Sequence, residues 1–336
     1  MNKMNLTQVV LGIDIGGTNT VFGLIDEEGK CYLKGTISTT LYRSADSLFS
    51  NLFKIFNSKY ELIRNKYELI GIGIGAPSAN YKTGALEYPS NLNWGKVDIY
   101  SVVGQYSDLP VVIENDANAA AIGELKYGAA KDFKNFIEIT LGTGLGSGIV
   151  LDGNIVYGFE GLAGEIGHTI VLENGRNCSC GRKGCLETYS SANGIKRTVF
   201  ELLSQHTNES ILREYSFNEL NSKLIFDAAI SGDKIAKIAF EKTGAILGKA
   251  MANSVAHFNP EAIVLFGGLA LSGDLILVPF KEHLEKNLLF MYKDRIKIVQ
   301  SELNNSGNAA ILGAAAISWH TIKNRQIDFD NNYKTI

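Results

Sequence analysis

The segment Asp14-Ile-Gly-Gly-Thr18 combines residue types that suit phosphate binding. Its two glycines carry no Cβ atom, so backbone N–H groups can approach phosphate oxygens, and the Thr18 hydroxyl adds a donor. Asp14 could hold a magnesium ion through a bound water. A plain hairpin turn accounts for the same residues equally well. The segment is not a P-loop, because the pattern G-x-x-x-x-G-K-[ST] occurs nowhere in the sequence.

A second glycine-rich run, Gly142-Thr-Gly-Leu-Gly-Ser-Gly148, links two apolar segments. Each glycine in an extended segment costs roughly 0.5–1 kcal/mol relative to alanine, so glycines at alternate positions predict a ligand close to the backbone. The run lacks the G-x-G-x-x-G spacing of dinucleotide-binding folds and returns into a strand. Gly267-Gly268, at the end of a predicted strand, could pass a nucleotide base closely, although alone the pair is also typical of a turn.

Glu114-Asn115-Asp116 lies where a predicted strand meets a predicted helix. Asp116 is a candidate general base, since a carboxylate at this junction can reach a reacting hydroxyl. Asn and Asp are also good helix N-caps, and the motif alone favours that structural interpretation.

Three of the four cysteines, Cys178, Cys180 and Cys185, lie within eight residues of each other, and His168 precedes them by ten residues. Disulfides are not expected in a reducing cytosol, whereas one histidine and three cysteines make a tetrahedral zinc set. Four protein ligands leave no open position, so we expect a structural rather than a catalytic zinc. The Cys-x-Cys spacing is tighter than the usual Cys-x₂-Cys.

To be held in place, these motifs must lie at the ends of strands or at the starts of the helices that follow those strands. Apolar runs and turn signals predict strands at 8–15, 21–25, 31–37, 69–74, 111–114, 136–141, 149–151 and 262–266, and helices at 44–66, 117–126, 243–257 and 309–319. Alternating glycines in 69–74 predict close approach by another backbone. The plan strand, glycine loop, strand and Asp turn of residues 9–29 recurs after 126 positions. Such a duplication predicts two lobes with a cleft between them.

The composition limits the class of protein. Over 336 residues, 45% hydrophobic and 20% charged residues are typical of a globular chain, and this length favours two domains. The net charge of −3 gives no electrostatic reason to expect a nucleic-acid or membrane partner. No apolar stretch reaches the roughly 20 residues of a membrane span. The N-terminal apolar run contains Asp14 and no cleavage-like site, so a cytoplasmic protein is expected.

Taken together, the motifs resemble the ROK family of sugar kinases over about residues 9–316. The resemblance is carried by the motifs at Asp14, Gly142 and Glu114, by Gly164-Glu-Ile-Gly-His168, and above all by Cys178-x-Cys-Gly-x-x-Gly-Cys185-Leu-Glu187. Pro89-Ser-Asn-Leu-Asn-Trp94 and Gly75-Ala-Pro-Ser-Ala-Asn80 are most similar to the bacterial glucokinases of that family. Many members have glycine where this chain has Ser78, and that loop faces the sugar, so the sugar's identity stays open.

The resemblance implies an α/β, two-lobed, actin-like ATPase (ribonuclease-H-like) fold with a structural zinc loop. The small N-terminal lobe would comprise residues 1–114 and about 310–336, and the large lobe residues 115–309. The implied ATP-binding residues are Asp14, Gly16, Gly17, Thr18, Thr143, Gly144, Gly267 and Gly268, with magnesium held by Asp14 through water. The implied sugar-binding residues are Ser90, Asn115, Asp116, Glu165, His168 and Glu187, with Asp116 as base. The implied zinc ligands are His168, Cys178, Cys180 and Cys185.

The implied activity is transfer of a phosphoryl group from Mg-ATP to the 6-hydroxyl of glucose, by a cytoplasmic homodimer with structural zinc. Alternatives on the same frame are a ManNAc or GlcNAc kinase and a fructokinase. The family also includes sugar-responsive repressors, but those carry an N-terminal helix-turn-helix, for which a first strand near Gln8 leaves no room. A sugar-binding protein without catalysis is disfavoured by Asp14 and Asp116. An actin-like assembly protein is disfavoured by the metal loop and the sugar-binding set.

Overall fold

The computed structural model describes residues 6–333 except 88, 90, 91, 93 and 304–306, and the chain forms two compact units. Unit 1 comprises Met1–Lys131, Tyr157–Ala163 and Asn305–Ile336, and unit 2 comprises Asp132–Val156 and Gly164–Asn304. The lobe boundary expected after Glu114 stays a prediction. The compact unit 1 continues to Lys131 because helix α3 (Asp116–Tyr127) packs along α8 (Ala309–Tyr333).

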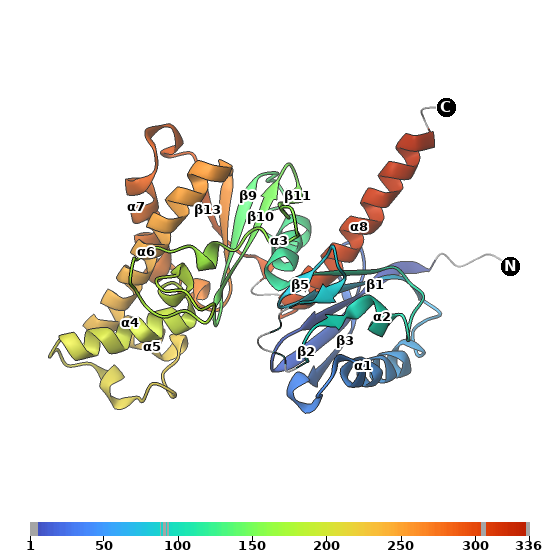
Figure 1. Cartoon of the computed structure of the whole chain (residues 1–336), viewed down its shortest axis with the longest axis horizontal. Coiled ribbons are helices and arrows are strands. Elements are labelled where there is room, and N and C mark those ends of the chain that lie inside the picture. The colour runs from blue at the N-terminus through green and yellow to red at the C-terminus, as the bar shows by residue number, and fades with distance from the viewer. Residues whose placement is uncertain (1–5, 88, 90–91, 93, 304–306, 334–336) are drawn as a thin grey trace. The chain divides into compact units, whose positions relative to one another are not determined.

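Unit 1 is built on a five-stranded sheet in the order β3-β2-β1-β4-β8 (Figure 1). Its strands are β1 (Thr7–Ile15), β2 (Asn19–Ile25), β3 (Cys31–Ser38), β4 (Tyr67–Ala76) and β8 (Val111–Asn115). β2 is antiparallel to both β1 and β3, whereas β4 runs parallel to β1 and to β8. All five strands predicted for this part of the chain are confirmed. β1 is a near-continuous apolar run because both of its faces are covered.

Helices cover both faces of this sheet. α1 (Ala45–Tyr60) and α2 (Ile99–Val103) share one apolar core with the sheet, which includes Phe22, Phe49 and Phe56. α1 begins after its N-cap Ser44 but ends at Tyr60, earlier than predicted, because the chain turns over residues 61–66. A small sheet of β5 (Ala79–Asn80), β6 (Ala85–Leu86) and β7 (Val97–Asp98) follows β4.

Glycines in β1 and β4 let α8 lie close to the sheet. A Cβ atom on Gly73 would meet the Ala314 carbonyl oxygen at 1.9 Å, and one on Gly12 would meet the Ile311 carbonyl oxygen at 2.6 Å. The predicted backbone approach at residues 69–74 is therefore confirmed, and the approaching backbone is that of a helix.

Unit 2 repeats the strand plan of unit 1. Its sheet has the order β11-β10-β9-β12-β13, with β9 (Phe136–Leu141), β10 (Leu145–Leu151), β11 (Asn154–Ile155), β12 (Ala262–Phe266) and β13 (Lys297–Gln300). β10 is antiparallel to β9 and β11, whereas β12 is parallel to β9 and β13. The repeated strand plan inferred from the glycine loops is confirmed by this topology, whereas the cleft expected between two lobes stays a prediction. β10 begins at Leu145, so only Gly142–Gly144 of the glycine-rich run form the loop.

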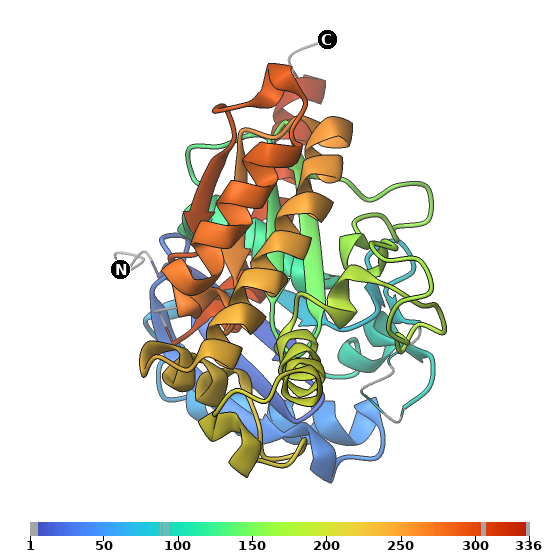
Figure 2. The ribbon, with the colours of Figure 1, turned by 90° about the vertical axis from the view of Figure 1, so that its left-hand side faces the viewer.

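The helices of unit 2 pack on the core face of its sheet. They are α4 (Ala192–Gln205), α5 (Ser222–Ile230), α6 (Lys234–Phe258) and α7 (Asp274–Asn287). α6 and α7 lie side by side (Figure 2), and Gly244 and Gly248 of α6 face the backbone of α7. Short 3₁₀ turns occur at Thr39–Leu41, Ile166–His168, Leu186–Thr188, Ile211–Glu214, Ala270–Ser272 and Phe290–Tyr292. Among the described residues, no helix has the length and apolar character needed to cross a membrane.

Candidate active site and metal centre

In unit 1 three predicted residues meet at one edge of the sheet. β1, β4 and β8 are parallel, and near their carboxyl ends Asp14 pairs with Gly75, which in turn pairs with Glu114. Asn115 ends β8, and Asp116 opens α3. Open α/β sheets bind ligands at the carboxyl ends of their strands, where loops and helix N-termini gather. The fold therefore unites Asp14 with Asn115 and Asp116, which are far apart in sequence.

The charge of Asp116 acts on the carboxylate of Asp14. Burial, and then the charge of Asp116, raise the pKa of Asp14 from 3.8 to about 7. Burial also raises the pKa of Asp116, while the N–H of Ala117 lowers it. Asp116 nonetheless has a solvent-exposed surface. Many protein atoms surround its carboxylate, but the carboxylate is still accessible to a substrate. Two carboxylates that repel each other also favour a bound cation.

The first turn of α3 fixes the side chains of Asn115, which precedes the helix, and of Asp116, which begins it. The N–H of Ala117 donates to Asn115 Oδ1 and to Asp116 Oδ1, each at 2.9 Å. The N-cap interpretation is confirmed for Asn115. Since Oδ1 of Asn115 already accepts a hydrogen bond, its amide NH₂ group is the part that remains to donate to a ligand.

The turn after β1 explains one of its two glycines. The N–H of Gly16 donates to the Asn19 carbonyl oxygen at 3.0 Å, and a Cβ atom on Gly16 would come within 2.8 Å of that oxygen. Gly16 is therefore required by the hairpin itself. Gly17 is half-buried and Thr18 is exposed, so both can be reached by a ligand.

In unit 2 the two predicted glycine loops emerge at one edge of the sheet, because β9 and β12 are parallel neighbours. The carbonyl oxygens of Gly142 and Thr143 accept the N–H groups of Ala192 and Asn193, at 2.9 and 3.4 Å, which ties the exposed Thr143 to the start of α4. Gly267 has a φ of +94° and packs on Leu141. A Cβ atom on Gly268 would meet nothing within 4 Å, so its exposed backbone is open to a ligand.

The close approach predicted for the glycine-rich run is real at Gly144, but the neighbour is a side chain of the protein itself. A Cβ atom on Gly144 would lie 2.3 Å from Glu187 Oε2. That oxygen accepts the N–H of Leu145 at 3.0 Å, and Glu187 Oε1 lies 3.8 Å from Cys178 Sγ. Glu187 therefore joins the glycine loop to the cysteine cluster.

The predicted zinc ligands come together as a set. The ligand atoms of His168, Cys178, Cys180 and Cys185 all lie within 4.8 Å of one another. His168 Nδ1 is 3.6 Å from Cys178 Sγ, and Cys180 Sγ is 3.6 Å from Cys185 Sγ. Zinc–sulfur bonds of about 2.3 Å imply tetrahedral edges of about 3.8 Å, so the four residues fit a zinc ion. His168 Nε2 lies 4.0 Å from Glu165 Oε2, so Nε2 can serve a second partner.

Turns and one arginine shape the cysteine loop. Gly181 and Gly184 adopt φ values of +86° and +77°, and a Cβ atom on Gly184 would lie 1.8 Å from the Leu172 carbonyl oxygen. Arg176 binds the Thr188 carbonyl oxygen at 2.6 Å and Glu201 Oε2 at 2.7 Å, which ties the loop to α4. The loop thus keeps its shape through backbone geometry and a largely buried guanidinium.

Two predicted sugar ligands are less defined. Ser90 lies outside the described residues, and its role stays a prediction. The Glu165 side chain is 66% exposed and lies beside His168. No signal in the sequence indicates that the Glu114 carboxylate is buried, where it accepts hydrogen bonds from the N–H of Asn115 and from the side chain of Asn118.

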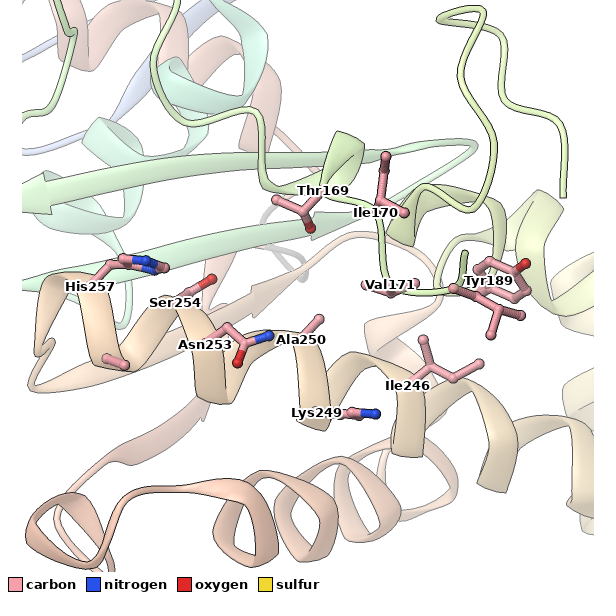
Figure 3. A pocket seen from close by; sticks show the side chains of 12 residues that line it. Thr169, Ile170, Val171, Tyr189, Ile246, Lys249, Ala250, Asn253, Ser254 and His257 are labelled. Carbon is pink, nitrogen blue, oxygen red and sulfur yellow. The ribbon is translucent and has the colours of Figure 1, made fainter. Parts of the chain in front are cut away.

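A pocket of about 560 Å³ lies on unit 2, and its lining begins at Thr169, directly after His168 (Figure 3). The segment from Thr169 to Leu172 forms one wall, and one side of α6, including Ile246 and Asn253, forms another. None of its lining residues belongs to the predicted ATP-binding, sugar-binding or zinc-binding sets. We therefore do not assign this pocket to the phosphoryl-transfer site.

The family model of the ROK family matches residues 10–321. A glucokinase of Halalkalibacterium halodurans is 36% identical over 307 residues, which cover 90% of this chain and 92% of that protein.

Two solved structures resemble the fold closely. A ROK family glucokinase from Streptomyces griseus, in complex with glucose and AMPPNP, is 30% identical with a TM-score of 0.76, and the match covers 93% of this chain and 99% of that one. A ROK family transcriptional regulator is 26% identical with a TM-score of 0.81, and the match covers 93% of this chain and 79% of that one. Overall fold similarity therefore does not separate kinases from regulators.

Proposed function

The chain belongs to the ROK family and is an ATP-dependent hexose kinase, and we propose that its acceptor is the 6-hydroxyl of glucose. The observation that carries the proposal is the placement of Asp14 and Asp116 at the carboxyl edge of one sheet, where their charges interact. Phosphoryl transfer needs a positioned base and charge neutralisation, and these two carboxylates can supply them.

Asp116 acts as the base in this proposal. The glucose 6-oxygen attacks the γ-phosphorus of ATP in line, its bond to phosphorus forms as the bond to the β,γ-bridging oxygen breaks, and ADP leaves. An ordinary carboxylate is too weak to ionise the alcohol beforehand, so Asp116 orients the hydroxyl and accepts its proton late. The N–H of Ala117 holds the carboxylate for this task.

The remaining residues have binding roles in the proposal. Sugar hydroxyls are bound by Asn115, as a donor, and by Glu165, His168, Glu187 and Ser90. ATP phosphates are bound by the Asp14–Thr18 and Gly142–Gly144 loops, and Gly267-Gly268 flanks adenosine. Asp14 would hold magnesium through water, and magnesium would neutralise phosphate charge. Zinc bound by His168, Cys178, Cys180 and Cys185 would fix the loop that carries Glu187. The short distances between the ligand atoms of these four residues support this zinc site.

The test is ADP release from Mg-ATP with glucose, mannose, fructose, GlcNAc or ManNAc as acceptor, with Asp116→Asn protein measuring background ATP hydrolysis. We expect the highest kcat/KM with glucose. A preference for an N-acetyl sugar or fructose would overturn glucose as the acceptor. No sugar-dependent ADP from zinc-loaded protein would overturn the kinase and favour the regulator, whose fold is equally similar.

A cytoplasmic homodimer completes the proposal and is supported by the family resemblance. Light scattering on the purified protein tests it: a mass twice that of one chain is expected, and a monomer over the micromolar range would exclude the dimer.

A further inference from the structure

The pocket of unit 2 lies between the segment Thr169–Leu172 and one face of α6 (Figure 3). The segment forms an apolar wall, and its Ile170 and Leu172 are 58% and 53% exposed. Most of the lining residues of α6 recur at a four-residue spacing, so they lie in rows along the helix. One row is mainly apolar and the neighbouring row is polar: Ile246, Ala250 and Ser254, and Lys249, Asn253 and His257.

Ser254 is buried in the first of these rows, with 7% of the residue exposed. In the part of the chain that the structure describes, its hydroxyl forms no hydrogen bond. Thr243 of the same helix instead donates to the Ala239 carbonyl oxygen at 2.8 Å, a common solution for a hydroxyl in a helix. Figure 3 shows Ser254 on the side of α6 that faces Thr169. The Ser254 hydroxyl therefore faces the pocket, where a ligand can supply its hydrogen bond.

Lys249 and Asn253 add donors at the exposed edge of the pocket. Among the described residues, Lys249 forms no ion pair and the Asn253 side chain forms no hydrogen bond. An ammonium, an amide NH₂ group and the Ser254 hydroxyl thus lie within two turns of α6. A carboxylate is the matching group, because it only accepts hydrogen bonds and its charge is opposite to that of Lys249. The apolar part of the same ligand would lie against Ile246 and the Thr169–Leu172 wall.

The apolar wall is hydrogen-bonded to the cysteine loop. The Thr169 carbonyl oxygen accepts the N–H of Leu186 at 2.9 Å, and the N–H of Val171 donates to the Gly184 carbonyl oxygen at 2.9 Å. The wall thus pairs with the chain that carries Cys185, and both segments belong to unit 2. Because they form one ladder, a ligand that holds the wall also restrains the loop.

We propose that this pocket binds an amphipathic carboxylate, with its charged group on Lys249, Asn253 and Ser254 and its apolar chain along the Thr169–Leu172 wall. The volume of about 560 Å³ lies within the range of small-molecule sites, roughly 300–1,000 Å³. The site goes beyond the proposed hexose kinase activity, since none of its residues has a role in phosphoryl transfer. Binding should order the cysteine loop, because the wall and the loop are joined.

The test is calorimetric titration of the protein with sodium octanoate, with hexanoate and decanoate to vary the chain and octylamine to reverse the charge. Lys249→Gln removes the ammonium and keeps most of the stem, and Ser254→Ala removes the hydroxyl. The matched controls are Lys237→Gln, exposed on α6 outside the pocket, and Ser204→Ala, whose exposed hydroxyl donates to the Glu201 carbonyl oxygen at 2.7 Å. Amide hydrogen exchange over 169–172 and 184–187 is measured with and without octanoate.

We expect one octanoate per chain, with an affinity that rises about three- to fourfold per methylene from hexanoate to decanoate. Lys249→Gln and Ser254→Ala should each weaken octanoate binding about tenfold, because each loses a hydrogen bond to a charged group, and the two controls should bind as the wild type does. Octylamine should bind at least tenfold more weakly than octanoate. Octanoate should slow exchange in both segments.

Ser254→Ala without the probe should unfold at the same urea concentration as the wild type or at a higher one. The substitution removes no hydrogen bond within the protein, and alanine has the higher helix propensity. A clear loss of stability would show that the hydroxyl already has a partner and would count against the site.

Equal affinities for octanoate and octylamine, or wild-type affinity in both Lys249→Gln and Ser254→Ala, would overturn the proposal, because apolar contact alone would then explain the binding. The absence of saturable binding would overturn it as well. Binding that weakens as the protein concentration rises, while the mass from light scattering doubles, would assign the pocket to a second copy of the chain instead of a carboxylate. These outcomes do not depend on hexose phosphorylation, which the panel of acceptor sugars tests separately.

Discussion

The carboxylate of Glu187 accepts the backbone N–H of Leu145 at 3.0 Å, and this bond links the cysteine loop to the glycine loop of unit 2. Gly144 lacks a side chain because that carboxylate occupies the space where a Cβ atom would lie. Glu187 also approaches Cys178 Sγ at 3.8 Å. A proposed sugar ligand, a proposed phosphate loop and a proposed zinc ligand are thus neighbours through one side chain.

Gly144→Ala should therefore act through Glu187. The new methyl group would displace the Glu187 side chain, whose tip can move, and the bond to Leu145 N–H would be lost. We expect a loss of about 1–2 kcal/mol in unfolding free energy and a larger rise in the KM of the sugar than in that of ATP. The control is the stability of Gly142→Ala, where the nearest atom lies 3.9 Å from the added Cβ. A rise confined to the ATP KM would contradict this role of Gly144.

Asp116→Asn should separate binding from turnover. The amide keeps the size of the side chain and the acceptor for Ala117 N–H but cannot take up a proton, so kcat should fall roughly 10²–10⁴-fold. The affinities for sugar and ATP, measured by calorimetry, should change only a few-fold. Asp152→Asn, in the β10–β11 turn at a φ of +50°, serves as control with unchanged kinetics. Near-normal turnover of Asp116→Asn would exclude Asp116 as the base.

The raised pKa of Asp14 predicts a pH-dependent stability in protein free of magnesium and nucleotide. The folded chain binds this proton more tightly than the unfolded chain, whose Asp14 has the ordinary pKa of 3.8. The stabilising contribution is thus complete below pH 3.8 and is lost as the pH rises to about 7. The difference between the two pKa values corresponds to a change of at most about 4 kcal/mol in the free energy of unfolding.

Asp14→Asn should consequently unfold at a higher urea concentration than the wild type at pH 8. At pH 5 the increase in stability should be less than half as large.

Asp98→Ala is a control whose stability should change with pH in the opposite direction. Asp98 caps α2 and its pKa is lowered by hydrogen bonds from Ser101, so its removal should destabilise the protein more at pH 8 than at pH 3. A gain for Asp14→Asn that does not depend on pH would refute the ionisation argument.

Cys180→Ala should abolish zinc binding and weaken sugar binding. Removing one of four ligands leaves an incomplete tetrahedral set, so zinc measured by mass spectrometry should fall from one per chain to nearly none. The sugar KM should rise because His168 and Glu187 lose their support. Cys31→Ala, whose half-buried thiol lies outside the cluster, should keep its zinc. Zinc at one per chain with an unchanged sugar KM in Cys180→Ala would be incompatible with the proposed site.

Ser78→Gly should stabilise the protein. Ser78 has a φ of +56°, a conformation that costs a non-glycine residue about 1–2 kcal/mol, of which part is offset by the greater freedom of glycine in the unfolded chain. We expect a net gain of about 0.5–1 kcal/mol in urea unfolding. Ser78→Ala keeps the strained backbone and should show no gain. Equal stability of the two variants would show that the backbone at this position is unstrained.

Much of the fold follows from local pattern. Apolar runs ended by glycine or Asp turns located the central strands of both sheets, and the recurrence of the glycine hairpin anticipated two sheets of one plan. Helix ends were less accurate: α1 stops at Tyr60, and α6 begins at Lys234, well before residue 243. Caps such as Asp233 and short turns decide these ends, and their signals are weak beside the hydrophobic period.

The sequence by itself determined the residue types available for chemistry and, through the spacing of Cys178, Cys180 and Cys185, a metal-binding loop. The tertiary structure decided which neighbours these residues have. Packing buried Asp14, strand pairing placed it beside the start of α3, and both raise its pKa, while packing also filled the space at Gly144 with Glu187. Contacts of this kind join residues tens of positions apart, and they depend on strand register and packing, which local composition does not encode.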